Sequence, residues 1–110
     1  MIIAGGTDYT SSDSGDPLIN FYTAVTRKSP YGVAEEWNGQ EKITREEALR
    51  MLTLDAAYAA FEEDIKGSIE AGKLADVVVL SQDIMKIDEE EILNTEVLMT
   101  ILDGKIIYSK

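Results

Sequence analysis

The C-terminal end of the chain predicts a β-hairpin, and this hairpin limits the folds open to the chain. Two apolar, β-branched runs, 97–102 and 105–108, flank the pair Asp103-Gly104. An Asp-Gly pair suits a two-residue hairpin turn, because the turn requires a positive φ at both central positions. The run at 97–102, like an earlier run at 77–80, is apolar on both faces. We therefore expect the sheet to be covered on both faces.

Capping residues predict two helices before this sheet. Asp16-Pro17 is typical of a helix start, with Asp as the cap and Pro at the first helical position. Thr44 and Glu47 have the spacing of a capping box, in which each side chain bonds the backbone of the other residue. We expect a helix to begin after each of these caps.

Weaker patterns predict four further elements. An alanine-rich segment at 55–61 indicates another helix, which Asp55 could cap after a break in the preceding helix. Short stretches at 2–4 and 68–69 indicate strands. The acidic segment 88–93 predicts a short helix, because acidic residues stabilise the positive end of a helix dipole.

Residues 67–74 come within one residue of a phosphate-binding loop, but the chemistry fails. The loop needs Ser or Thr after Gly-Lys to bind magnesium, and Leu74 stands there instead. Glu70 would place a carboxylate among the phosphates. The segment also leads into a predicted strand, whereas a phosphate-binding loop opens a helix. We therefore expect no nucleotide site here.

Composition excludes several classes of function. The chain has 110 residues, room for one domain or a piece of a larger one, and 45% of them are hydrophobic. Its net charge of -11 disfavours nucleic acid and anionic membranes as partners. No apolar run approaches the roughly 20 residues needed to span a bilayer, and no signal peptide is apparent. A cytoplasmic location is the expectation, with which the lack of cysteine is compatible.

The sequence has no histidine, which restricts its chemistry further. Histidine is the usual general base near neutral pH and the commonest transition-metal ligand. Without histidine or cysteine, a metal bound by this chain alone would need an oxygen-only site, which favours magnesium or calcium over zinc.

The order of several short motifs resembles the C-terminal end of metal-dependent amidohydrolases, specifically the branch that contains amidohydrolase family 3 and N-substituted-formamide deformylases. The resemblance covers nearly the whole chain. Four motifs carry it in order: Gly6-Thr7-Asp8 with Asp16-Pro17-Leu18, Thr44-x-x-Glu47-Ala48-Leu49, Gly67-Ser68-Ile69-Glu70-x-Gly72-Lys73-x-Ala75-Asp76, and Val97 to Tyr108.

The resemblance implies an α+β fragment of a longer protein. Residues 1–64 would form the last strand, loop and helices of a TIM (β/α)8 barrel. Residues 65–110 would form the C-terminal part of the composite β-sandwich, with the hairpin at 97–108. The fragment's partners would be the rest of the barrel and a small-molecule amide substrate. The histidine ligands and the bridging Lys or Glu of the family would all lie upstream.

The resemblance also implies a role for Asp8. In the family, the Asp at the tip of the eighth strand contacts the metal-bound water and acts as general base, and it can serve as a metal ligand. Residues at the C-terminal ends of barrel strands are well placed for catalysis. From the residues alone, a turn residue after a strand is the better explanation of Asp8, and the resemblance is what favours the catalytic role.

Two weaker candidates for substrate contact are Arg27 and Trp37. Arg27 is expected near a helix C-terminus, where a cation also complements the helix dipole. Trp37 could line a substrate pocket or could serve as an ordinary packing anchor.

Two functions remain open from the sequence. The first is the C-terminal portion of a hydrolase that acts on carbon–nitrogen bonds of amides or cyclic amides and uses a divalent metal, with zinc as the expected ion. The 110-residue chain alone would then bind no metal cofactor, would be inactive and would self-associate. The alternative is a non-catalytic α+β binding or oligomerisation module.

Overall fold

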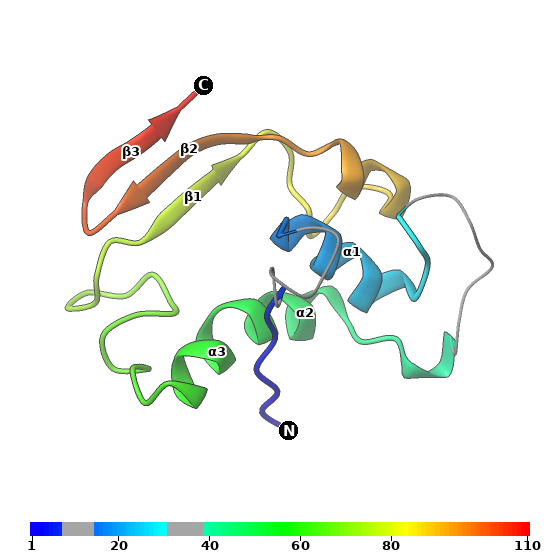
Figure 1. Cartoon of the computed structure of the whole chain (residues 1–110), viewed down its shortest axis with the longest axis horizontal. Coiled ribbons are helices and arrows are strands. Elements are labelled where there is room, and N and C mark those ends of the chain that lie inside the picture. The colour runs from blue at the N-terminus through cyan, green and yellow to red at the C-terminus, as the bar shows by residue number, and fades with distance from the viewer. Residues whose placement is uncertain (8–14, 31–38) are drawn as a thin grey trace.

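The computed structural model describes residues 1–7, 15–30 and 39–110 as an α+β arrangement (Figure 1). Among these residues, three α-helices precede a three-stranded sheet, with one short 3-10 segment between the first two helices and another between the first two strands. The elements are α1 (Pro17–Thr26), η1 (Gly39–Glu41), α2 (Arg45–Leu52), α3 (Leu54–Ala59), β1 (Val77–Leu80), η2 (Glu89–Asn94), β2 (Val97–Leu102) and β3 (Lys105–Ser109). In the described part of the chain, no helix is long and apolar enough to cross a membrane.

The predicted caps of the first two helices are confirmed. The Asp16 side chain accepts a hydrogen bond from the backbone N–H of Leu18, at 2.9 Å. The Thr44 side chain accepts from the Glu47 backbone N–H, and the Glu47 carboxylate accepts from the Thr44 N–H at 2.8 Å. Local side-chain chemistry therefore sets both helix starts.

The break after α2 is also confirmed. Thr53 has φ -126° and ψ -90°, which interrupts the helix between α2 and α3. The expectation that Asp55 caps α3 is wrong, because α3 begins at Leu54 and Asp55 lies inside its first turn, where it is buried. The corner between α2 and α3 is thus stabilised by contacts other than a side-chain cap.

The hairpin forms as predicted. The strands are antiparallel in the order β1-β2-β3, and Leu102 pairs with Lys105 across the turn. Asp103 and Gly104 have φ of 48° and 76°, the left-handed conformation that this two-residue turn requires.

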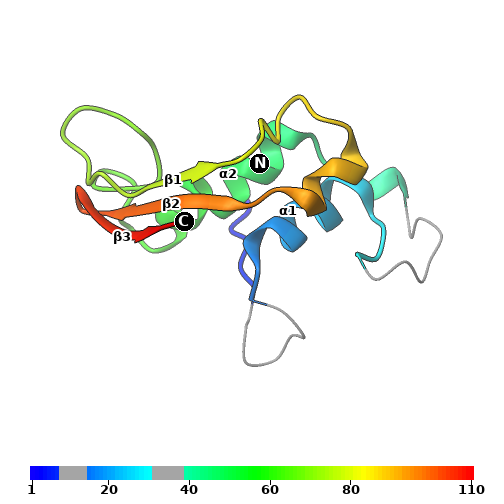
Figure 2. The same cartoon turned by 90° about the horizontal axis from the view of Figure 1, so that it is seen from above.

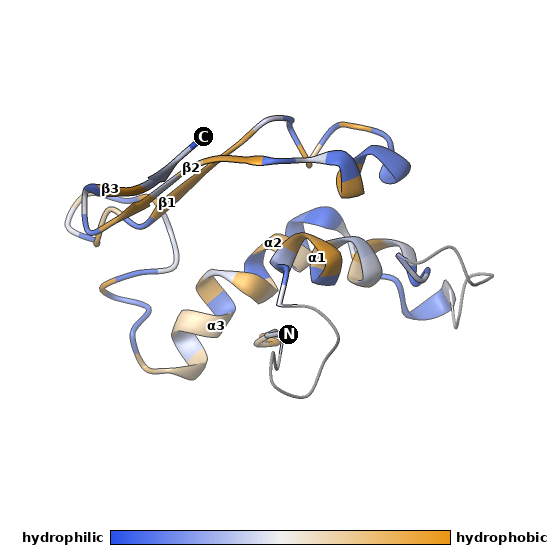
Figure 3. Cartoon of the chain, turned by 45° about the horizontal axis from the view of Figure 1, so that its top comes forward, coloured by the Kyte–Doolittle hydropathy of each residue, from blue (hydrophilic) through white to orange (hydrophobic). Residues whose placement is uncertain are grey.

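The core lies where α1 packs against α2 and η2. Apolar residues concentrate on α1 and on the strands (Figure 3). The buried members of the core cluster are Phe21, Tyr22, Val25, Ala48, Ile84 and Ile92.

Three of the expected elements differ in the structure. Residues 2–4 form no strand, because the described residues offer them no neighbouring strand and their backbone bonds the α2–α3 corner instead. Residues 68–69 belong to a closed loop rather than to a strand. The helix expected at 88–93 is the 3-10 segment η2, in which the Asp88 side chain makes no cap hydrogen bond.

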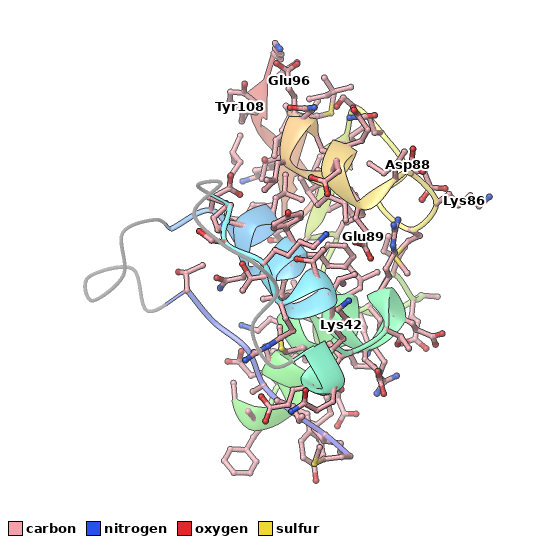
Figure 4. All side chains as sticks on the ribbon, turned by 90° about the vertical axis from the view of Figure 1, so that its right-hand side faces the viewer. Lys42, Lys86, Asp88, Glu89, Glu96 and Tyr108 are labelled. Carbon is pink, nitrogen blue, oxygen red and sulfur yellow. The ribbon has the colours of Figure 1, made fainter. Side chains whose placement is uncertain are left out.

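The expectation that the sheet is covered on both faces is not met within the described residues. The sheet extends away from α1 (Figures 1 and 2), and Tyr108 lies at the sheet end of the molecule (Figure 4). Exposed apolar side chains occur on all three strands, namely Val78, Val79, Leu98, Leu102, Ile106, Ile107 and Tyr108. The sheet therefore leaves apolar surface in contact with water.

Candidate functional site

The N-terminal segment 1–7 leads directly into the candidate catalytic residue Asp8 and is bound to the α2–α3 corner. The backbone N–H of Ile3 donates to the Asp55 carboxylate at 3.4 Å, and the N–H of Gly5 donates to the Met51 carbonyl at 2.9 Å. A Cβ atom on Gly5 would lie 2.6 Å from Met51 Cγ. Glycine at this position therefore allows the segment to approach α2 closely.

Asp8 and Trp37 themselves lie outside the described residues, so their predicted roles stay predictions. What the structure adds is the chain geometry immediately before Asp8. Gly5 and the two residues that follow it connect the anchored backbone to the candidate carboxylate.

Arg27 ends α1 in the left-handed conformation, with φ 57°, and its N–H donates to the Thr23 carbonyl at 2.8 Å. Its guanidinium Nη2 lies 3.4 Å from Glu41 Oε2. The described contacts of Arg27 thus join α1 to η1. Its predicted contact with substrate stays a prediction.

Two cavities adjoin the α2–α3 corner. The larger, about 830 Å³, lies between this corner and β1 and is lined largely by apolar side chains such as Leu49, Leu52, Ala57 and Val78. The smaller, about 270 Å³, lies beside the N-terminal segment and is lined by residues that include Ile2, Arg50, Asp55, Glu63 and Lys73. Neither cavity offers the ligand set of a zinc site, because the described residues include no group of three or more potential metal-ligating side chains.

Residues 67–74, whose sequence comes within one residue of a phosphate-binding loop, make structural contacts in the described part of the chain. Gly67 has φ 98°, and a Cβ there would lie 2.8 Å from the Cβ of Ala57, so glycine permits close packing on α3. Lys73 Nζ lies 2.8 Å from Ser68 Oγ and 3.0 Å from Glu70 Oε2. The Ser68 hydroxyl donates in turn to Glu70 Oε2. This hydrogen bond, together with that from Lys73, holds the pKa of the Glu70 carboxyl below its ordinary value. The lysine therefore bonds its own loop.

Asp55 bonds the N-terminal segment at Ile3, a contact different from the helix cap that the sequence predicted for it. It is 6% exposed, and its Oδ1 lies 3.1 Å from Arg50 Nη2. The signal available from the sequence was the pairing of opposite charges across the predicted break at Thr53. Its long-range contact with Ile3, however, depends on the fold.

Comparison with known proteins identifies the class. A sequence model described as "Amidohydrolase family" matches residues 1–108. The chain is 38% identical over 94 residues to the N-substituted formamide deformylase of Arthrobacter pascens, a match spanning 86% of this chain and 17% of the deformylase. It is 32% identical over 111 residues to the putative amidohydrolase YtcJ of Bacillus subtilis, across 100% of this chain and 21% of YtcJ.

A solved structure shares the fold. A mutant of the atrazine chlorohydrolase TrzN from Arthrobacter aurescens, complexed with zinc and atraton, matches 90% of this chain and 23% of its own, with a TM-score of 0.62 and 21% identity. The chain belongs to the amidohydrolase family, as its motif order predicted. It spans about a fifth of the length of the curated relatives named here.

Proposed function

We propose that this chain is the C-terminal portion of a metal-dependent hydrolase that acts on carbon–nitrogen bonds of amides or cyclic amides. The observation that carries the proposal is the family match over residues 1–108, which includes Asp8. The name of the deformylase from Arthrobacter pascens supports an N-substituted amide as the kind of substrate.

In this proposal, residues 1–64 are the end of a TIM-barrel domain and residues 65–110 belong to a β-sandwich domain. Two observations support that division. All described α-helices lie before residue 60, and all described strands lie after residue 76. The apolar sheet faces would be covered by the rest of the longer protein or, in the isolated chain, by a second copy.

Asp8 would act as the general base of this hydrolase. Its carboxylate would accept a proton from the attacking water and return that proton to the nitrogen of the leaving amine as the carbon–nitrogen bond breaks. A divalent metal would lower the pKa of the attacking water. The described residues and the lack of His and Cys do not fit a zinc site within this chain, so the ion would require ligands from outside it.

The proposal is tested by assaying amide hydrolysis in a longer polypeptide that contains both this chain and the metal ligands outside it. N-substituted formamides and cyclic amides are suitable substrates. Replacing Asp8→Asn should lower kcat by about 100-fold or more, because a positioned general base contributes roughly 100- to 10,000-fold. Asp64→Asn is the matched control, since Asp64 is exposed and has no described hydrogen bond.

The alternative function, a non-catalytic binding or oligomerisation module, predicts different results. No tested amide would be hydrolysed, and the sequence joined to this chain would contain no His-x-His pair. The exposed apolar sheet favours this alternative only in part, because a neighbouring domain of an enzyme would cover the same surface.

A further inference from the structure

The smaller cavity, beside the N-terminal segment, is lined by a carboxylate with a buried oxygen that lacks a hydrogen-bond partner. Within the described residues, Glu63 Oε2 is buried and accepts no hydrogen bond, although Glu63 lines a cavity of about 270 Å³. Buried polar atoms are almost always hydrogen-bonded, because an unpaired one loses its contact with water and gains nothing in return. The Oε2 atom therefore marks a place where a hydrogen-bond donor from a ligand would be stabilised.

The chain reversal after α3 brings Glu63 to this cavity. Phe61 adopts the left-handed conformation, with φ 60°, and so turns the chain back at the end of the helix. The backbone N–H of Glu62 then donates to the Ala57 carbonyl at 2.9 Å. Backbone hydrogen bonding at the end of α3 therefore sets the position of Glu63 beside the helix.

The other charged residues that line the cavity form ion pairs with one another. Arg50 Nη2 lies 3.1 Å from Asp55 Oδ1, and Lys73 Nζ lies 3.0 Å from Glu70 Oε2. Each of these pairs carries no net charge. Glu63 is the remaining charged residue of the described lining, so its ionised carboxylate gives the cavity one uncompensated negative charge. The electrostatic complement of this lining is a cation with a single positive charge.

Apolar and aromatic side chains complete the lining. They are Ile2, Leu54 and Tyr58. Ile2 is 52% exposed and Tyr58 is 50% exposed, so the cavity is open to molecules from solution on this side. Its volume of about 270 Å³ is slightly below the roughly 300 Å³ at which ordinary ligand pockets begin. The cavity therefore suits a small ion that also has a short apolar part, and an aromatic ring can contact the cationic group as well.

We propose that this cavity is a binding site for a small alkylammonium ion, a monovalent organic cation with a short apolar chain. The ammonium group would donate to Glu63 Oε2 and would supply the missing hydrogen bond and the missing positive charge together. Its chain would contact Leu54 and Tyr58. A metal ion does not fit, because the described residues include no group of three or more potential metal-ligating side chains. The proposal does not depend on the proposed hydrolase activity.

NMR titration of the 110-residue chain with n-butylammonium tests the site. The backbone amides of Ile2, Glu63 and Lys73 should shift and saturate together, with a Kd on the order of 1 mM. n-Butanol has the same apolar chain without the charge and should bind at least about 10-fold more weakly, because it cannot form a charged hydrogen bond with Glu63 in the same way. Sodium chloride at equal concentration controls for ionic strength. Shifts that do not saturate, or that sodium chloride reproduces, would overturn the proposal.

Two variants of the lining and one control show whether the binding depends on these residues. Glu63→Gln should raise the Kd for n-butylammonium by about 10-fold or more, because it removes the charge at nearly constant volume. Tyr58→Ala should also raise the Kd, and it tests the site with Glu63 intact if Glu63→Gln does not fold. Asp64→Asn is the matched control at the neighbouring, exposed carboxylate and should leave the Kd unchanged. A wild-type Kd in both lining variants would overturn the proposal.

The same ion is then offered to a longer polypeptide that contains this chain, with binding followed by ligand-observed NMR. We expect binding to be retained and to be weakened by Glu63→Gln. Absence of binding there, alongside binding to the 110-residue chain, would overturn the proposed ligand site, because a group of the longer polypeptide would then occupy the cavity.

Discussion

Replacing both isoleucines of β3 by threonine should weaken self-association of the 110-residue chain. Ile106 and Ile107 are each 61% exposed. The chain exposes 7604 Å², whereas a folded monomer of this mass exposes about 6,000 Å² by the usual scaling. The difference, roughly 1,600 Å², is about twice the area of about 800 Å² that each partner buries in a standard protein–protein interface. Threonine keeps the β-branched shape that the strand favours while removing apolar surface.

The size of the effect follows from the exposed fraction. Full burial of an isoleucine stabilises by about 1.5–3 kcal/mol. With 61% of each side chain exposed, roughly 1–2 kcal/mol remains to be gained when each is covered. Replacing isoleucine by threonine would remove about 1 kcal/mol of this burial free energy at each position. A two-fold dimer uses each position twice, so one covered isoleucine per chain changes the association free energy by about 2 kcal/mol, or roughly 30-fold in Kd.

Sedimentation equilibrium over a range of protein concentrations measures this Kd, and circular dichroism checks that the double variant keeps its fold. Ile69→Thr is the control, because Ile69 is 84% exposed but lies outside the sheet. The reasoning is refuted if the wild-type chain is monomeric with fully protected sheet amides. It is also refuted if the control weakens association as much as the β3 variant.

Three other predictions concern folding. Thr44→Ala removes the side-chain bond to the Glu47 N–H and should lower the free energy of unfolding by about 1 kcal/mol in urea denaturation; no change would mean that the cap does not stabilise α2. Ile92→Ala, at a fully buried core position, should cost about 2–5 kcal/mol, and a loss below that range in the same assay would argue against a packed core at η2. The hydrogen bond from the Thr44 backbone N–H, with that from its hydroxyl, holds the pKa of Glu47 below its ordinary value of 4.5. The stability gained from this ionised carboxyl is therefore present above pH 4.5 and is lost as the pH falls through the lowered pKa. The difference in unfolding midpoint between wild type and Glu47→Gln should therefore shrink as the pH is lowered through the pKa of Glu47. A difference independent of pH would contradict the stabilising role of the ionised Glu47 carboxyl.

Elements determined by neighbouring residues could be predicted from the sequence. The Asp103-Gly104 turn and the Thr44–Glu47 capping box each depend on contacts within a few residues, and both form as predicted. The family could also be predicted, because its motifs are short and ordered along the chain.

Features that depend on distant contacts could not be predicted in this way. The segment at 2–4 has the composition of a strand, but strand formation needs a partner that the described residues do not supply. The sequence around Asp55 predicted a local helix cap. Its bond to Ile3 joins residues 52 positions apart and could not be predicted from that local sequence. The sequence does not indicate that the side chain of Lys73, a charged residue beside a turn glycine, is only 14% exposed.

The central claim is tested most directly in the longer, zinc-loaded polypeptide that contains both this chain and the metal ligands outside it. Its turnover of N-substituted formamides and cyclic amides is compared between the wild type and Asp8→Asn. The account predicts hydrolysis of a carbon–nitrogen bond by the wild type, and a loss of about 100-fold or more in kcat for the variant with bound zinc unchanged. Equal turnover by the two proteins, at equal zinc content, would contradict it.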